Sequence, residues 1–65
     1  MKVRDVIKLI EKDGWFLARI RGSHRQFHHD LKAGTVTVSG KESIEMPIGT
    51  LNSVLKQAGL KKTRG

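Results

Sequence analysis

Hydrophobic residues near the start of the chain recur at the spacing of an amphipathic helix. They occupy positions i, i+3, i+4 and i+7 of one stripe, namely Val3, Val6, Ile7 and Ile10. Asp5 lies where the first turn would be, which suits the helix dipole, and Gly14 is suited to a left-handed cap after the last turn. The pattern predicts a helix over residues 3–13.

The same spacing returns near the end of the chain and predicts a second helix. Its apolar positions are Leu51, Val54, Leu55 and Ala58. Gly59 follows directly and can end the helix, so we expect it over residues 48–58. We expect one folded domain over residues 1–60, followed by a basic C-terminal tail over residues 61–65.

Between these helices lie short segments rich in β-branched and aromatic residues, which predict three strands. We expect them over residues 15–20, 23–29 and 35–38. Arg21-Gly22 is the predicted turn between the first two strands. A two-residue turn there would place Arg19 opposite His24.

Strand alternation assigns the side chains of the sheet to two faces. The face expected to form the core holds Phe16, Ala18, Ile20, Phe27, Val36 and Val38, and the other holds Trp15, Leu17, Arg19, His24, Gln26 and His28. Two amphipathic helices suffice to cover the first face. We therefore predict a small α+β domain of order α-β-β-β-α, with two helices on one face of a three-stranded antiparallel sheet. Double-stranded-RNA-binding domains have the same order of elements.

Charge narrows the possible partners of such a domain. The chain of 65 residues has 13 Lys+Arg against 6 Asp+Glu, a formal net charge of +7, and contains no cysteine. A basic excess attracts polyanions, of which nucleic acid is the first candidate and an acidic protein the second. The lack of cysteine excludes disulfides and thiolate metal sites. No apolar run reaches membrane-spanning length, so we expect a soluble, cytoplasmic protein with no membrane partner.

Candidate chemistry is concentrated in the segment Gly22-Ser23-His24-Arg25-Gln26-Phe27. Histidine can accept and return a proton near neutral pH, because its unperturbed pKa is about 6.5. Cleavage of RNA without a metal requires such a proton acceptor or donor. His24 is therefore the candidate catalytic residue, and Arg19 is a candidate clamp for the scissile phosphate. The structural alternative for each side chain is a solvated position on a strand.

Four further residues have both a functional and a structural interpretation. Ser23 could bind phosphate or cap the turn. Arg25 alternates to the face opposite His24 but could reach a phosphate from the edge of the sheet. His28 could be a second proton carrier or a solvated residue, and Trp15 could stack on a base or cover the sheet. We predict no metal site, because His24 and His28 lie too far apart along an extended strand to share one ion.

Four segments, in order along nearly the whole chain, resemble the HicA (YcfA-like) toxin family of bacterial toxin–antitoxin systems. They are Lys12-Asp13-Gly14-Trp15, the stretch Arg19-x-x-Gly22-Ser23-His24 with Phe27, Thr35-Val36-Thr37-Val38, and the closing segment from Gly49-Thr50-Leu51 to Gln57-Ala58-Gly59-Leu60. No single segment is specific, and the combination carries the resemblance.

This resemblance implies a small RNA-binding domain that cleaves mRNA without a metal or small-molecule cofactor and is inhibited by a HicB-like antitoxin. It implies that the histidine of the Gly-Ser-His motif, here His24, carries the activity. Many members have a second histidine in a Val-Pro-x-His segment after the third strand. Residues 38–42 read Val-Ser-Gly-Lys-Glu instead, which leaves Lys41 as a candidate local cation.

The functional hypothesis is thus an mRNA endoribonuclease toxin that uses His24 as general acid or base and holds RNA with Arg19, Ser23, Arg25, His28 and Lys41. Two alternatives remain open: a non-catalytic RNA-binding module of the same fold, and an interaction domain whose basic face serves an acidic protein. Neither alternative needs the Gly-Ser-His motif.

Overall fold

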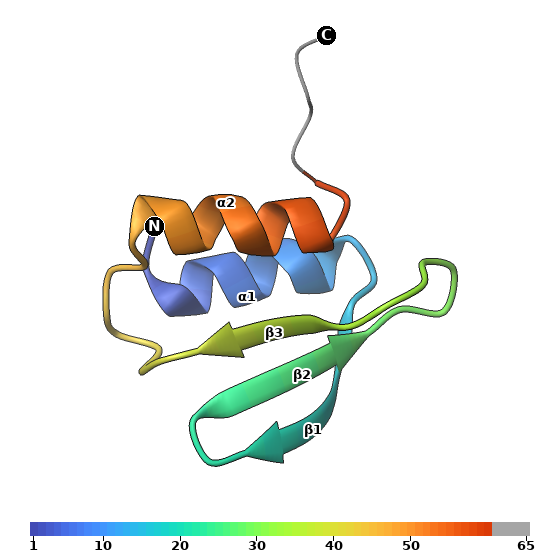
Figure 1. Cartoon of the computed structure of the whole chain (residues 1–65), viewed down its shortest axis with the longest axis horizontal. Coiled ribbons are helices and arrows are strands. Elements are labelled where there is room, and N and C mark those ends of the chain that lie inside the picture. Colours follow the sequence, from blue (N-terminus) through green and yellow to red (C-terminus); the bar gives the residue numbers. More distant parts are fainter. Residues whose placement is uncertain (61–65) are drawn as a thin grey trace, which may run out of the picture.

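The computed structural model of the protein describes residues 1–60, and its elements follow the expected order (Figure 1). They are α1 Val3–Lys12, β1 Phe16–Arg21, β2 His24–His28, β3 Val36–Ser39 and α2 Ile48–Gln57. The predicted α+β fold and the order α-β-β-β-α are confirmed, and each bound lies within one residue of its prediction. The predicted tail lies outside the described residues.

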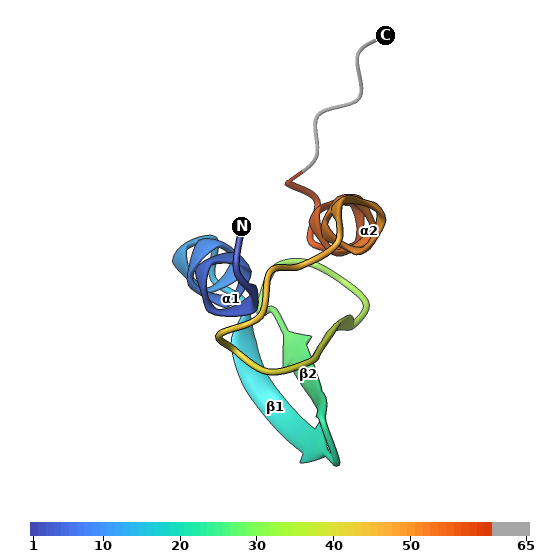
Figure 2. The same cartoon turned by 90° about the vertical axis from the view of Figure 1, so that its left-hand side faces the viewer.

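The three strands form one antiparallel sheet in the order β1-β2-β3, with both helices on the same face (Figures 1 and 2). We call this the helix-side face and the opposite one the open face. The helices pack over β3, whereas β1 contacts mainly β2, and the β1–β2 hairpin reaches away from both helices (Figure 2). Within residues 1–60, neither helix is long and apolar enough to cross a membrane.

The core lies between the helices and the inner part of the sheet. Its buried side chains are Val3, Val6, Ile10, Trp15, Phe27, Val36, Val38, Met46, Val54 and Ala58. The inward positions predicted for Phe27, Val36 and Val38 are confirmed. Val54 in α2 and Ala58 directly after it are buried as the periodicity predicts, whereas Leu55 is only partly buried and lies outside the core cluster.

The predicted register of β1 and β2 is wrong, because the turn lies one residue further along the chain. Gly22 and Ser23 are its central residues, and His24 pairs with Arg21 instead of Arg19. Gly22 has a φ of 57°, while no residue other than glycine has a positive φ among those described. A glycine with positive φ at the first central position is the pattern of a type II′ turn, which fits the twist of a hairpin.

A β-bulge between Leu17 and Arg19 causes the second error, the assignment of faces in β1. The extra residue, Ala18, interrupts the alternation, so that Leu17 lies opposite the buried Phe27 while Phe16 lies opposite His28. All six residues of β1 are exposed. Phe16, Ala18 and Ile20 are therefore not core residues. The bulge places Phe16 on the face away from the helices, and Ile20 keeps the helix side but lies where the hairpin extends past the helices.

Trp15 lies in the core and not on the open face, so it is not available to stack on a base. Its side chain is 2% exposed, and its Nε1–H donates a hydrogen bond of 3.2 Å to the carbonyl oxygen of Ala58. The indole thus anchors the start of β1 to the end of α2. A buried indole N–H needs such a partner, and the backbone carbonyl that ends α2 supplies it.

The loop between β3 and α2 caps the first helix. The backbone N–H groups of Val3 and Arg4 donate to the carbonyl oxygens of Ile44 and Glu42, at 2.9 and 3.0 Å. These amides have no partner within their own helix, so the loop satisfies them. The capping holds residues 41–45 beside α1 and near the sheet end where β2 begins.

Candidate catalytic and RNA-binding site

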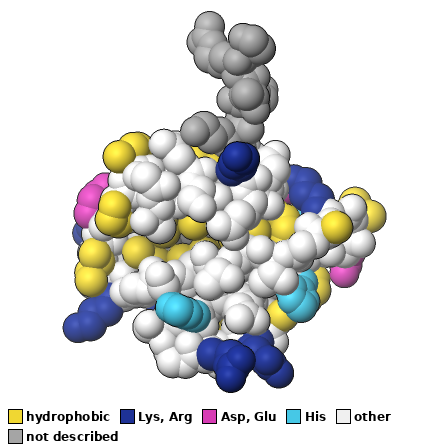
Figure 3. All heavy atoms as spheres, in the orientation of Figure 1, with side chains coloured by type: hydrophobic (Ala, Val, Ile, Leu, Met, Phe, Trp, Pro, Cys, Tyr) yellow, Lys and Arg dark blue, Asp and Glu magenta, His cyan; other side chains and the backbone are white. Residues whose placement is uncertain are grey.

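The open face of the sheet presents the predicted site. Cross-strand partners share a face, so residues opposite His24, Gln26 and His28 lie with them. These partners are Arg21, Arg19 and Phe16 on β1, and Ser39 and Thr37 on β3. Histidine side chains lie over β2 and basic side chains gather at the end of the molecule formed by β1 (Figure 3).

His24 is the first residue of β2 and directly follows the tight turn. It lies between Arg21 on one neighbouring strand and Ser39 on the other. The side chain is exposed, and among residues 1–60 it makes no hydrogen bond or ion pair. The ring nitrogens of His24 are therefore accessible for proton exchange with a bound molecule.

Arg21 is the cation that sequence reasoning missed. It lies directly opposite His24, and Arg19 lies opposite Gln26, one pair further from the turn. Directly opposed residues have Cα atoms about 4.5–5.5 Å apart, so the Arg21 guanidinium can reach the same phosphate as His24. The Gly-Ser dipeptide was the available indication, because a type II′ turn begins with glycine.

Ser23 and Lys41 lie at the same end of the sheet as His24. Ser23 is the exposed second central residue of the turn. Lys41 is exposed and follows Ser39, the β3 partner of His24, by two residues. The structure thus brings four of the polar residues near the turn to one end of the open face: Arg21, Ser23, His24 and Lys41.

Arg25 lies on the helix-side face, away from His24. Its Nη1–H donates to the carbonyl oxygen of Gly40 at 2.9 Å, and its Nη2 lies 3.9 Å from the Glu42 carboxylate. β2 is the central strand, so Arg25 is not at a sheet edge. These contacts hold the guanidinium to the β3–α2 loop.

His28 shares the open face with His24 but lies at the far end of β2. They are four positions apart, which corresponds to about 13 Å along an extended strand. The His28 ring meets Phe16 edge to face, with centroids 6.4 Å apart. This distance is too long for the two imidazoles to act on one phosphate, so His28 is a candidate for contact with a more distant part of an RNA chain.

His29 directly follows β2 and has a structural role. Its Nδ1 accepts hydrogen bonds from the backbone N–H groups of Leu31 and Lys32, at 2.9 and 3.2 Å, and its Nε2 lies 2.7 Å from the carbonyl oxygen of Asp13. This pattern requires the tautomer with the proton on Nε2. Gly14 makes room for the ring, because a Cβ there would lie 2.7 Å from Nε2.

Lys32 completes the contacts around His29. Its ammonium lies 2.6 Å from the Asp13 carboxylate and 3.0 Å from the carbonyl oxygen of Ala58. The hydrogen bond from Lys32 lowers the pKa of Asp13, against the raising effect of burial. We call Asp13, Trp15, His29, Lys32 and Ala58 the polar junction, since they join the ends of both helices to the β2–β3 loop.

The described part of the chain offers no cluster of metal-ligand side chains. Within residues 1–60, no three His, Asp or Glu side chains come together in a geometry that could hold a metal ion. That RNA cleavage by this protein needs no metal ion stays a prediction, which a chelator can test.

Comparison with known protein families finds a match to the sequence of this chain. A family model described as the HicA toxin of bacterial toxin–antitoxin systems matches residues 3–60. The match spans all five elements and includes the turn and His24. No curated protein matches the chain at a significant level.

Proposed function

This chain belongs to the HicA toxin family of bacterial toxin–antitoxin systems, and we propose that it is a metal-independent endoribonuclease that cleaves mRNA. Membership of this family means that the protein is a toxin whose partner is an antitoxin. The finer proposal is that His24 transfers the proton, that mRNA is the substrate, and that a HicB-like antitoxin inhibits the protein in the cytoplasm.

One observation carries the proposal: an exposed imidazole, unpaired among residues 1–60, lies directly opposite an exposed arginine on the open face. Cleavage without a metal requires that the RNA 2′-hydroxyl lose its proton and its oxygen attack phosphorus. The bond from phosphorus to the 5′ oxygen then breaks, and that oxygen takes up a proton. The products are a 2′,3′-cyclic phosphate and a 5′-hydroxyl, and no water is consumed.

Arg21 and Arg19 have the position to stabilise the charge that develops on the phosphate. A guanidinium can donate two parallel hydrogen bonds to phosphate oxygens, and Arg21 lies beside His24 for this purpose. Arg19 would hold the next phosphate along the open face. Ser23 and Lys41 add a hydroxyl donor and a further cation at the end of the sheet where His24 lies.

His24 would carry one of the two protons that the reaction moves. His28 cannot supply the other proton at the same phosphate, because it lies about 13 Å away along β2. The exposure of His24 leaves room for water, which can exchange the second proton. His24 acts as the base on the 2′-hydroxyl or as the acid on the leaving oxygen in this scheme.

The test compares the parent protein with His24→Ala on end-labelled mRNA, with and without excess chelator. We expect His24→Ala to fold, to bind RNA nearly as well as the parent, and to cleave about 10²–10⁴-fold more slowly. The parent should leave cyclic-phosphate ends and keep its activity in chelator. Ile48→Ala is the control, because Ile48 is exposed at the start of α2, away from the open face.

The alternative function is a non-catalytic RNA-binding module, and the distance between His24 and His28 favours it. Such a module would arrest growth by sequestering RNA. Equal growth arrest by His24→Ala and the parent, in cells that lack the antitoxin, would support this alternative and contradict the catalytic role of His24. Loss of cleavage by the parent in chelator would contradict the proposal that no metal takes part.

A further inference from the structure

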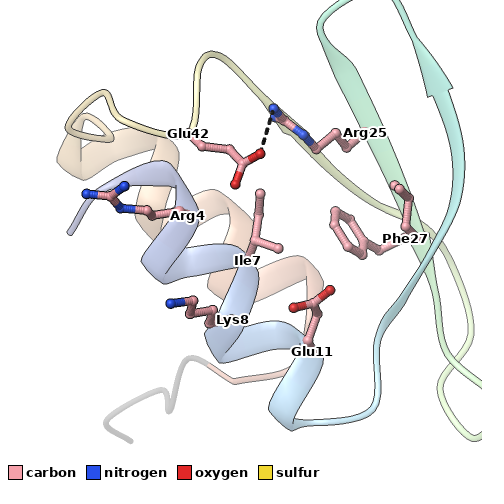
Figure 4. Close-up of a pocket in the computed structure, with 8 residues that line it drawn as sticks. Arg4, Ile7, Lys8, Glu11, Arg25, Phe27 and Glu42 are labelled. Atoms are coloured by element: carbon pink, nitrogen blue, oxygen red, sulfur yellow. Dashed lines mark ion pairs between the residues drawn. The ribbon is translucent and has the colours of Figure 1, made fainter.

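A cleft of about 420 Å³ opens between α1 and the β1–β2 hairpin, on the helix-side face (Figure 4). Its floor is apolar and consists of Ile7, Leu17 and Phe27. Its rim carries Arg4, Lys8, Glu11, Arg25 and Glu42, of which Arg25 and Glu42 form an ion pair with each other. The floor is open to solvent at Leu17, whose exposed fraction is 45%.

The free edge of β1 borders this cleft. β1 is an outer strand of the sheet, and within residues 1–60 its backbone pairs only with β2. The other outer strand, β3, is screened by α2, since the Thr37 N–H points to Oε1 of Gln57 at 3.4 Å. An outer strand with unpaired N–H and C=O groups is a template for a further strand, so β1 is the edge at which the sheet can grow.

The two faces of β1 differ in chemistry in a way that defines what can bind there. Leu17 and Ile20 lie on the helix-side face, because their partners are Phe27 and Arg25. Arg19 and Arg21 lie on the open face. A strand added beside β1 would thus meet apolar side chains on one face and two cations on the other.

We propose that an extended segment of the antitoxin pairs with β1 as an added strand. Its sequence would alternate, with apolar residues pointing into the cleft and acidic residues opposite Arg19 and Arg21. We infer an acidic segment because its charge is complementary to that of this chain, whose formal net charge is +7. A second copy of this chain would instead bring its own Arg19 and Arg21 against the same cations.

The added strand would also act on the candidate RNA site. Arg21 lies opposite His24, so carboxylates paired with Arg21 and Arg19 would compete with phosphates for these guanidiniums. Inhibition then needs no contact with His24 itself. The inference rests on the family's toxin role and not on the proposed role of His24.

The test uses a short peptide of alternating valine and glutamate as a probe of the β1 edge. Its binding to the full chain is followed by NMR through amide chemical shifts and amide hydrogen exchange. We expect shifts in β1 and in the cleft-lining part of α1, and slower exchange at those β1 amides that do not bond to β2. The same peptide with lysine in place of glutamate should leave the spectrum unchanged.

Two variants and a matched control examine the cleft itself. Leu17→Asp should abolish the peptide-induced shifts, because it removes the apolar floor and adds a charge that repels the peptide. Lys8→Glu should weaken binding through the rim alone. Leu31→Asp makes the same substitution as the first variant at a side chain that is 90% exposed in the β2–β3 loop, and should bind like the parent.

Several outcomes would overturn the proposal. These are the absence of shifts in β1 at millimolar acidic peptide, equal binding of the lysine peptide, and unchanged binding by Leu17→Asp. Dimerisation of the free protein through β1 would point to a second copy, and oligouridine RNA that shifts the cleft residues would point to nucleic acid. Peptide binding is measured without cleavage, so failure of this proposal and failure of the nuclease assay are read separately.

Discussion

The polar junction and the turn end of the β1–β2 hairpin, which we call the hairpin end, both contain a histidine and a cation, but in opposite environments. At the junction, the His29 ring and the Lys32 ammonium have partners on neighbouring elements. At the hairpin end, His24 and Arg21 are exposed and, among residues 1–60, make no side-chain hydrogen bond or ion pair. The comparison indicates that a histidine and a cation hold the fold together at one end, whereas at the other end a histidine and a cation have no partner within residues 1–60 and can meet a ligand.

Burial explains this difference. A polar group withdrawn from water costs free energy unless it finds a hydrogen-bond partner, so the His29 ring and the Trp15 indole, which are 8% and 2% exposed, must be paired to be tolerated. A side chain in water meets no such requirement and keeps its full hydrogen-bonding capacity for a partner. We therefore expect substitutions at the junction to change stability, and those at the hairpin end to change binding or cleavage.

Trp15→Ala should give the largest change in stability. It removes a large buried side chain and its hydrogen bond to Ala58, which should cost about 3–5 kcal/mol. The total stability of a domain of this size is about 3–10 kcal/mol, so this variant should be largely unfolded at room temperature. Thermal unfolding by circular dichroism measures the effect, and Phe16→Ala on exposed β1 is the control. Similar losses at both positions would contradict the contrast between the two regions.

His29→Ala and His24→Ala should separate the two histidines by stability alone. Loss of the His29 ring leaves two backbone N–H groups and one carbonyl without their partner, at a cost of about 1–3 kcal/mol. His24→Ala should change the free energy of unfolding by less than about 0.5 kcal/mol, since it removes no contact within the described chain. Urea unfolding at neutral pH measures both. A larger loss for His24→Ala would mean that His24 has a structural role.

The smallest expected effect is the change in stability at acid pH that comes from Asp13. Because Lys32 lowers the pKa of this carboxyl in the folded state, Asp13 contributes stability above its unfolded pKa of about 3.9. That contribution is lost as the pH falls through the lower, folded pKa. Lys32→Met should therefore flatten the fall of stability in acid, as measured by urea unfolding from about pH 6 to pH 2. Lys12→Met, an exposed lysine in the last turn of α1, should keep the parent slope.

Periodicity was sufficient to predict the fold. In α1, α2 and β3 the spacing of the apolar residues shows which face is buried. Burial of that face drives the folding of these elements, so the spacing is enough to predict them. The same reasoning failed for β1, because a bulge interrupts alternation and no local pattern marks Ala18. Trp15 was misplaced for a related reason, since its burial depends on α2, a segment distant in sequence.

The site could be predicted only in part. The Gly-Ser-His motif indicated His24 as the candidate residue, and its exposed position at the turn is what the structure adds. The neighbouring cation depends on register, and a shift of the turn by one residue exchanged Arg19 for Arg21. The polar junction was not predictable, because His29, Asp13 and Lys32 meet only once both helices and the β2–β3 loop are in place.

The exposure of β1 has a consequence for how this protein can diverge. A strand without buried side chains tolerates substitution at little cost in folding free energy, whereas the core restricts what may replace Phe27 or Val36. The proposed recognition of a partner at β1 can therefore change while the rest of the fold is retained. Two copies of such a gene in one cell could each come to bind a different antitoxin through a few substitutions in this six-residue strand.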